Sequence, residues 1–319
     1  MNRQTLYLVL AGALIWVPVV VLIRPGWPVS MFVLAPLVLV PAGLRLVPAS
    51  GSPDQATRLL SASTGLQFPA AALLVVAFLL PAGLWAAALA VPWLVVTTMV
   101  ACVGLLRLKA RGFAPLAALS TDAGLVYLAV GGGWAVLSRW GARPMGFSDE
   151  IVQLTAVHFH FAGFVLPLLA GLAARSLPGG MARIAPVGVV AGVPLVALGI
   201  AFSPLLEVVA ACALAGASVL VALLQIRLAL QNLSAGARLL FAASGLSLLT
   251  GMVLAAAYAL GKFSGNPWLT IPQMLPTHGA INALGFGLLG LLAWHVHVTY
   301  LPSQNLEYHS VHGAPPLKR

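Results

Sequence analysis

Three histidines lie within long apolar stretches of this sequence. His158 and His160 belong to the stretch IVQLTAVHFHFAGFVLPLLAGL, which begins at Ile151, and His278 belongs to IPQMLPTHGAINALGFGLLGLL, which begins at Ile271. An ionisable side chain inside a membrane span is expensive to bury and usually faces the interior of the helix bundle or a cavity. Imidazole binds transition metals and haem, and it also accepts and releases protons near neutral pH. The three histidines therefore predict a metal or haem site, or a site on the path of a substrate or a proton.

Two of these histidines lie at the same depth along their stretches. If the helices begin at their outer ends with Glu150 and Thr270, His158 and His278 each lie about 12 Å inside at the helical rise per residue. Asn282 follows His278 by one helical turn, so both side chains belong to one face. We therefore expect the two helices to be neighbours that share a polar pocket, open toward the non-cytoplasmic side.

The spacing of His158 and His160 allows only one of them to face His278. Two positions correspond to about 200° around a regular helix, so the two rings point in different directions. We favour His160 slightly, because Gly163 and Pro167 give its face room and conformational freedom. The alternative is that each imidazole only forms a hydrogen bond with a neighbouring helix and specifies packing.

A metal held by these histidines would lack a carboxylate at matching depth. Metal-ligating histidines are normally oriented by further hydrogen-bond partners. The candidates for that role are amide and hydroxyl side chains in the same two stretches: Gln153, Thr155, Thr277 and Asn282.

Asp122 is the one carboxylate well inside an apolar stretch. Ser120, Thr121 and Asp122 together form a cluster that is typical of a helix N-cap, which favours a helix that starts at this point. The other interpretation is a role for Asp122 in the path of a substrate, an ion or a proton.

The composition excludes a soluble or a disordered protein. The chain has 319 residues, of which 61% are apolar and 7% are charged, whereas soluble domains have about 45–50% and about 25%. The mean hydropathy is +1.03. The net charge of +10 comes from basic residues that stand singly or in short clusters between apolar runs. Such residues indicate membrane topology and contacts with anionic lipid, so we expect lipid and not nucleic acid as the partner.

The apolar runs are long enough for membrane-spanning helices. We count ten of them, which predicts an all-α transmembrane helix bundle over residues 1–300 and a short, disordered cytoplasmic tail over 301–319. We expect the segment 48–63 to be a polar loop that can end as an interfacial helix. The expected spans are 5–23, 29–47, 64–80, 83–106, 117–138, 150–174, 184–202, 205–226, 238–261 and 272–296.

The basic residues divide unequally between the two faces that ten spans create. Four of them fall on one face: Arg24, Arg139, Arg143 and Lys262. The other twelve fall on the face that holds both termini: Arg3, Arg45, Arg58, Arg107, Lys109, Arg111, Arg175, Arg183, Arg227, Arg238, Lys318 and Arg319. Because cytoplasmic loops carry the excess of Lys and Arg, both termini are predicted to be cytoplasmic.

Small residues predict where helices approach each other closely. The run Gly131 to Gly133 is not a phosphate-binding loop, because no Gly-Lys-Ser follows it, and we interpret it as a packing surface. The last stretch carries a similar strip of small residues at Gly279, Ala283, Gly287 and Gly290.

Two stretches resemble the bacterial YndJ-like membrane proteins. The first is YLAVGGGWAVLSRWGARPMGFSDEIVQLTAVHFHFAGFVLPLLAG from Tyr127, with LTAVHFHFAGF as its most specific piece, and the second is HGAINALGFGLLG from His278. The resemblance implies that the two histidine-bearing helices define the family, so His158, His160, His278 and Asn282 are carried over as site residues. It also implies a polytopic membrane protein of a kind sometimes called a transporter.

Three functions are compatible with these features. The first is a transporter in the bacterial cytoplasmic (inner) membrane, and the small number of charges within the spans favours a small or lipid-like substrate. The second is a redox protein or enzyme that holds iron, copper or haem between the histidine-bearing helices. The third is a membrane or sensor component without catalysis, in which the polar residues specify packing. The sequence leaves the oligomeric state open.

Overall fold

In the computed structural model, residues 3–48 and 54–297 are described, and all their regular structure is helical. Nine helices in this part are long and apolar enough to cross a membrane, and Val9–Ile23 forms a shorter apolar helix. The expected polytopic all-α bundle of about ten spans is confirmed. The orientation of the termini stays a prediction, and the expected tail over 301–319 lies outside the described residues.

The described residues contain the α-helices α1 to α12, and several of them continue into π-helical turns. The first half of the described chain contains α1 (Arg3–Pro18), α2 (Trp27–Leu34), α3 (Val40–Leu44), α4 (Gln55–Leu79), α5 (Leu84–Arg111) and α6 (Leu116–Trp140). The second half contains α7 (Asp149–His160), α8 (Leu166–Ser176), α9 (Gly180–Phe202), α10 (Pro204–Ala229), α11 (Ala235–Phe263) and α12 (Ile271–Met274).

Three spans are built from several of these elements. The first joins α2 and α3 over Trp27–Leu44, the second joins α7 and α8 over Asp149–Ser176, and the third starts with α12 and continues to His297. We call the last two the α7–α8 span and the α12 span.

The span over Trp27–Leu44 is the most buried, with 83% of its residues inside the protein against 28% for α11. It is apolar on every side, and such a helix is stable only when other helices surround it. It packs against α1, α4, α7 and the start of the α12 span. This segment is therefore enclosed by helices from both ends of the chain.

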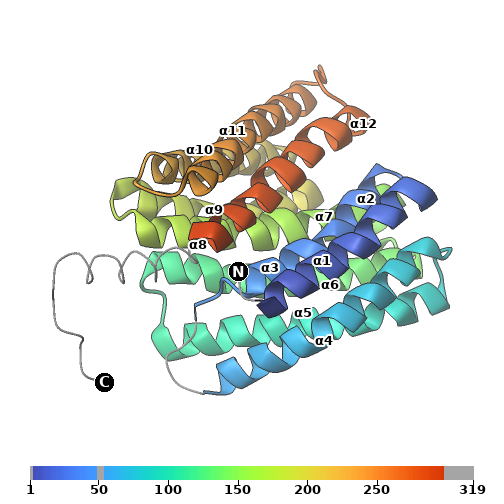
Figure 1. Ribbon diagram of the computed structural model, residues 1–319. Coiled ribbons are helices and arrows are strands. Elements are labelled where there is room, and N and C mark those ends of the chain that lie inside the picture. Colours follow the sequence, from blue (N-terminus) through green and yellow to red (C-terminus); the bar gives the residue numbers. More distant parts are fainter. Residues whose placement is uncertain (1–2, 49–53, 298–319) are drawn as a thin grey trace.

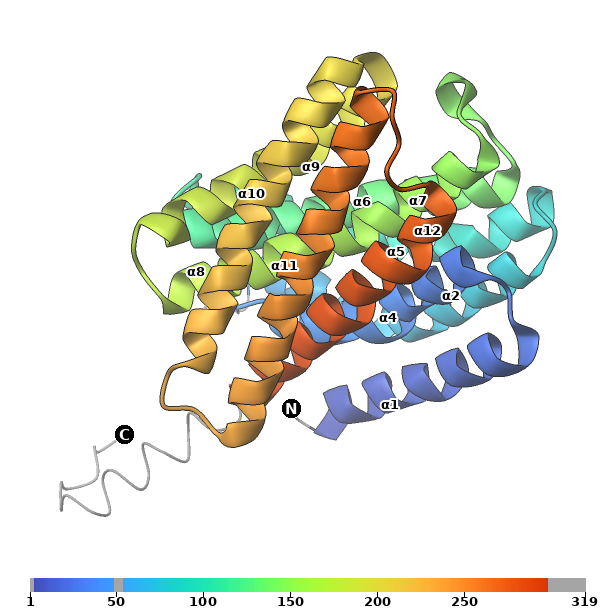
Figure 2. The same ribbon diagram turned by 90° about the horizontal axis from the view of Figure 1, so that it is seen from above.

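Helices that follow one another along the chain mostly pack side by side. The pairs α4 and α5, α5 and α6, α9 and α10, and α10 and α11 form extensive contacts, and the α7–α8 span connects the two groups through α6 and α9 (Figure 1). The α12 span then lies between α11 and α2 (Figure 2). It also contacts the π-helical turn of the α7–α8 span, so the expected neighbourhood of the two histidine-bearing helices is confirmed.

One expected boundary and one expected helix cap were wrong. The segment 48–63 does end in a helix, but this helix is the start of the span that was expected to begin at residue 64. α4 begins at Gln55, and the carboxylate of Asp54 caps it by accepting a hydrogen bond from the Thr57 amide at 2.8 Å. The interpretation of Asp122 as a helix cap was wrong, because α6 already begins at Leu116 after Pro115. The apolar residues before Asp122 continue the helix toward its N-terminus, and two arginines of α5 form ion pairs with the carboxylate.

Three π-helical turns occur at prolines inside spans. They cover Ala35–Leu39, Phe161–Val165 and Leu275–Gly279, with Pro36 and Pro276 inside two of them and Pro167 just after the third. Proline lacks a backbone N–H and clashes with the preceding turn, so the helix widens there instead of keeping its regular ladder. Such turns are frequent at functional sites. Two of the three lie beside the histidines.

Candidate functional site

His160 uses both of its ring nitrogens in the protein interior. Its Nδ1 donates to the Ala156 carbonyl at 2.7 Å, and its Nε2 accepts a hydrogen bond from Nε1 of Trp93 on α5 at 2.9 Å. The Phe32 ring meets the imidazole edge-on with a centroid distance of 5.0 Å, and the side chain of His160 is fully buried. Neither ring nitrogen of His160 is therefore free to bind a ligand.

Gly131 makes the position of His160 possible. A Cβ atom on this glycine would lie 2.7 Å from Nδ1 of His160, and a Cβ on Gly132 would lie 2.2 Å from the Thr97 hydroxyl. Two glycines of the Gly131 to Gly133 run thus bring α6 close to α5 and α7, as the sequence predicted. Trp93 was not recognised from the sequence, since nothing in its own stretch marks it as a partner of a histidine.

The preference for His160 over His158 as the partner of His278 was wrong. His160 points to α5, and the π-helical turn that widens the helix begins only after it, at Phe161. The room expected beside Gly163 does not orient the His160 ring, because the hydrogen bond from Trp93 holds that ring toward α5.

His278 and Asn282 form a second polar group, against α11. Nδ1 of His278 donates to the Gly251 carbonyl at 2.9 Å, and Nδ2 of Asn282 donates to the carbonyl of His278 at 2.8 Å. Gly251 allows this approach, because a Cβ on it would lie 2.3 Å from Nδ2 of Asn282. The shared face of the two side chains is as expected. Oδ1 of Asn282 is buried and has no hydrogen-bond partner among the described residues.

His158 lies two positions before His160 on α7, so it points to roughly the opposite side of the α7–α8 span. Nδ1 of His158 donates to the Leu154 carbonyl at 2.8 Å. The side chain is exposed. Because His160 points to α5, His158 is the histidine of this span that remains as the candidate partner of His278.

The protonation of these rings follows from their partners. A carbonyl oxygen can only accept, so Nδ1 carries the proton in His158 and in His278, and Nε2 is left as an acceptor. No described residue donates to either Nε2. Together with Oδ1 of Asn282, the two spans present three hydrogen-bond acceptors without a protein donor.

The three histidines do not converge on one point. Among residues 3–48 and 54–297, no group of three or more His, Cys, Asp or Glu side chains is arranged to hold a metal ion. Both ring nitrogens of His160 form hydrogen bonds with Ala156 and Trp93, and neither is available to a site that contains His278. A metal or haem bound here would rest on His158 and His278 alone, and this stays a prediction.

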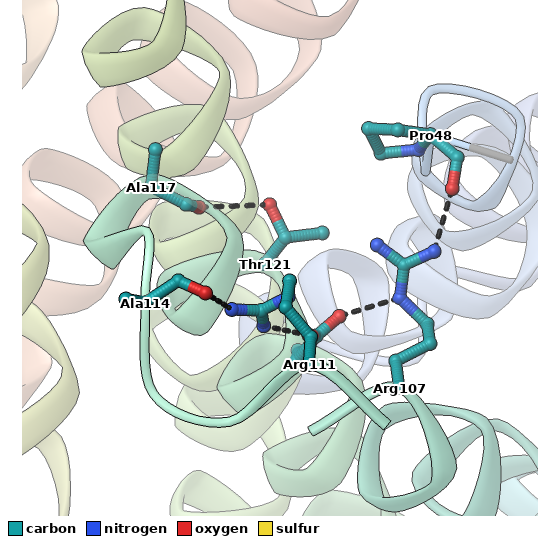
Figure 3. A network of polar contacts seen from close by, with 7 residues as sticks. Pro48, Arg107, Arg111, Ala114, Ala117 and Thr121 are labelled. Atoms are coloured by element: carbon teal, nitrogen blue, oxygen red, sulfur yellow. Dashed lines mark hydrogen bonds and ion pairs between the residues drawn. The ribbon is translucent and has the colours of Figure 1, made fainter. Parts of the chain in front are cut away.

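Asp122 belongs to a different network, at the other end of the helices. Its carboxylate is 1% exposed and accepts from Nε of Arg107 at 2.6 Å and from the guanidinium of Arg111. The same two arginines donate to the carbonyls of Pro48 and Ala114, each at 2.6 Å (Figure 3). The sequence signal for these arginines was only their place at the basic end of a span.

The fold and these polar groups define an integral membrane protein with several α-helical spans. The chain belongs to the YndJ-like protein family, whose model matches residues 30–286 and so extends far beyond the two stretches that showed the resemblance. It is 31% identical over 206 residues to the uncharacterized membrane protein YndJ of Bacillus subtilis (strain 168). That alignment covers 64% of this chain and 37% of the relative, so the chain matches well under half of the relative's length. No solved structure matches the chain.

Proposed function

We propose that this protein is a transporter of the bacterial cytoplasmic membrane that binds a small or lipid-like substrate between the α7–α8 span and the α12 span. The observation that supports this function is the set of unpaired acceptors at His158, His278 and Asn282. Of these acceptors Oδ1 of Asn282 is the buried one, and a buried polar atom without a partner costs about 1–3 kcal/mol. A substrate that donates hydrogen bonds removes this cost when it binds.

The acceptors define the substrate class. Groups that donate to two imidazole nitrogens and an amide oxygen are hydroxyls and amines. The small number of charges within the spans leaves the rest of the substrate apolar or weakly polar. The π-helical turns Leu275–Gly279 and Ile281–Leu288 surround His278 and Asn282. Interrupted helices at substrate sites are a recurring feature of transporters.

A lipid translocation assay tests this function directly. The purified protein is placed in liposomes with phosphatidylethanolamine that carries a fluorescent NBD group on one acyl chain, and dithionite bleaches the label in the outer leaflet. The free amine of this lipid is a donor, whereas acyl-labelled phosphatidylcholine offers no donor in its headgroup. We expect faster translocation of the former, and His278→Ala and Asn282→Ala should abolish the difference.

Thr250→Ala serves as the control, because Thr250 is a polar residue of α11 that is exposed and bonded only to Leu246 of its own helix. It should translocate both lipids like the unmodified protein. If protein-containing and protein-free liposomes bleach alike for both lipids, the lipid-like substrate is ruled out. If both site variants behave like Thr250→Ala, the site does not bind the substrate.

We also propose that residues 1–300 form one bundle whose basic end faces the cytoplasm, followed by a cytoplasmic tail over 301–319. The excess of Lys and Arg at that end supports this orientation. Reporter fusions at Pro315 and in the loop 262–269 should indicate opposite faces. Fusions that indicate the same face would contradict the orientation and the number of spans together.

A further inference from the structure

A cavity of about 430 Å³ opens at the basic end of the bundle, where α5 and α8 end and α6 begins. Its wall carries three arginines from two helices, Arg107 and Arg111 of α5 and Arg175 of α8, together with Thr121 of α6. Figure 3 shows Arg107, Arg111 and Thr121. This volume is within the range of small-ligand sites. The cavity is distinct from the site of the proposed function, which lies near the other ends of these helices.

Asp122 holds two of the arginines in place. The buried carboxylate takes one guanidinium on each oxygen, and the carbonyls of Pro48 and Ala114 take a second N–H from each. Nη2 of Arg107 and Nε of Arg111 form no hydrogen bond with any described residue. Two rigid guanidinium groups thus retain free donors at the cavity.

Arg175 supplies charge that the carboxylates do not neutralise. It lines the cavity, and no described residue forms a hydrogen bond or ion pair with it. The carboxylates of this region belong to Asp54, on the cavity wall, and to Asp122 beneath it. Three guanidinium groups against two carboxylates leave a net positive charge. An anion is therefore the ligand that this cavity attracts.

We propose that this cavity binds a phosphate group, carried by the headgroup of an anionic phospholipid or by a soluble phosphate ester. Guanidinium groups in fixed positions match the oxygens of phosphate and donate to them in pairs. The ends of membrane-spanning helices lie at the level of the lipid phosphates. Basic pockets between such helices bind anionic headgroups.

Thermal unfolding in a neutral detergent tests this binding. The lipid-depleted protein receives phosphatidylglycerol, phosphatidylcholine, inorganic phosphate or glycerol phosphate in parallel. We expect phosphatidylglycerol to raise Tm and phosphatidylcholine to leave it unchanged. Arg175→Gln should remove most of this rise and weaken the apparent affinity about tenfold, as expected for the loss of one charge-assisted contact. Arg175→Lys, which keeps the charge, should retain part of it.

Arg183→Gln is the matched control, because Arg183 is an exposed arginine near the start of α9 that does not line the cavity. It should respond like the unmodified protein. A rise of Tm with phosphatidylglycerol alone identifies the lipid headgroup as the source of the phosphate, and an equal rise with inorganic phosphate or glycerol phosphate identifies a soluble one. An equal response of Arg175→Gln and Arg183→Gln, or no response of the unmodified protein to any of the phosphates, overturns the proposal.

Discussion

His160 and His278 both lie in apolar spans, yet the protein uses them differently. His160 is fully buried, donates through Nδ1, accepts through Nε2 and packs against Trp93 and Phe32. His278 is half-buried and donates only through Nδ1, and its neighbour Asn282 keeps a buried oxygen without a partner. The first histidine is a part of the packing, whereas the second leaves acceptors available.

The two histidines differ in how far hydrogen bonds within the protein offset the free-energy cost of burying them. For His160 the cost of burial is offset within the protein by two hydrogen bonds, so its removal leaves Trp93 without an acceptor. For His278 and Asn282 part of the cost remains in the unliganded protein. Stability should therefore depend strongly on His160 and weakly on His278, and ligand binding should show the opposite dependence.

The largest effect is expected for His160→Ala. This change leaves a cavity beside Phe32 and an unpaired Nε1–H on Trp93, and it should lower the free energy of unfolding by about 3 kcal/mol. Thermal unfolding of the purified protein in detergent measures the change against His278→Ala. Equal stability of the two variants would remove the distinction between the two histidines.

The next effect is expected for Gly131→Ala. The added methyl group would lie 2.7 Å from Nδ1 of His160, and such overpacking costs about 1–3 kcal/mol. Gly133→Ala adds the same methyl group to the same helix where no atom lies within 4 Å, so it should be neutral or slightly stabilising. If both variants unfold at the same temperature, α6 does not need its glycine to accommodate His160.

A smaller effect is expected for Trp93→Phe. Phenylalanine keeps most of the ring but removes the donor to Nε2 of His160, which should cost about 1 kcal/mol. The double variant with His160→Ala should lose less than the sum of the two single variants, since both remove the same hydrogen bond. Strict additivity in unfolding measurements would mean that the bond contributes nothing.

The smallest effect on stability is expected for Asn282→Ala. Nδ2 contacts only His278 on the same helix, through its carbonyl at 2.8 Å and its Nδ1 at 3.2 Å, and Oδ1 has no partner among the described residues. The free energy of unfolding should change by less than about 1 kcal/mol, while the translocation described above should be lost. A variant that is strongly destabilised would show that Asn282 serves packing and not binding.

Several features of the fold and site followed from local pattern. The apolar runs predicted the spans, the common depth of the two histidine-bearing stretches predicted neighbouring helices, and the one-turn spacing placed His278 and Asn282 on one face. Gly131 marked a close approach. Each of these inferences depends on the period of the helix or on the length of a span, and both are properties of a single segment.

Other features depended on which helices meet. Nothing in the segment around Trp93 indicates that it donates to His160. The cluster of Ser120, Thr121 and Asp122 has the composition of a helix cap. Only the structure shows that Arg107 and Arg111 bind the Asp122 carboxylate. The choice between His158 and His160 failed for the same reason, because a ring turns toward the partner that satisfies it.

The sequence by itself determined that the chain is a bundle of membrane-spanning helices, because lipid admits only segments whose backbone hydrogen bonds close within the helix. It also singled out His160, His278, Asn282 and Asp122 as polar residues within that bundle. Only the tertiary structure decided how each of them is used. His160 and Asp122 find donors on other helices, whereas acceptors of His158, His278 and Asn282 find none within the described residues. A hydrogen bond between helices depends on the packing of two segments, and the pattern of either segment alone does not contain it.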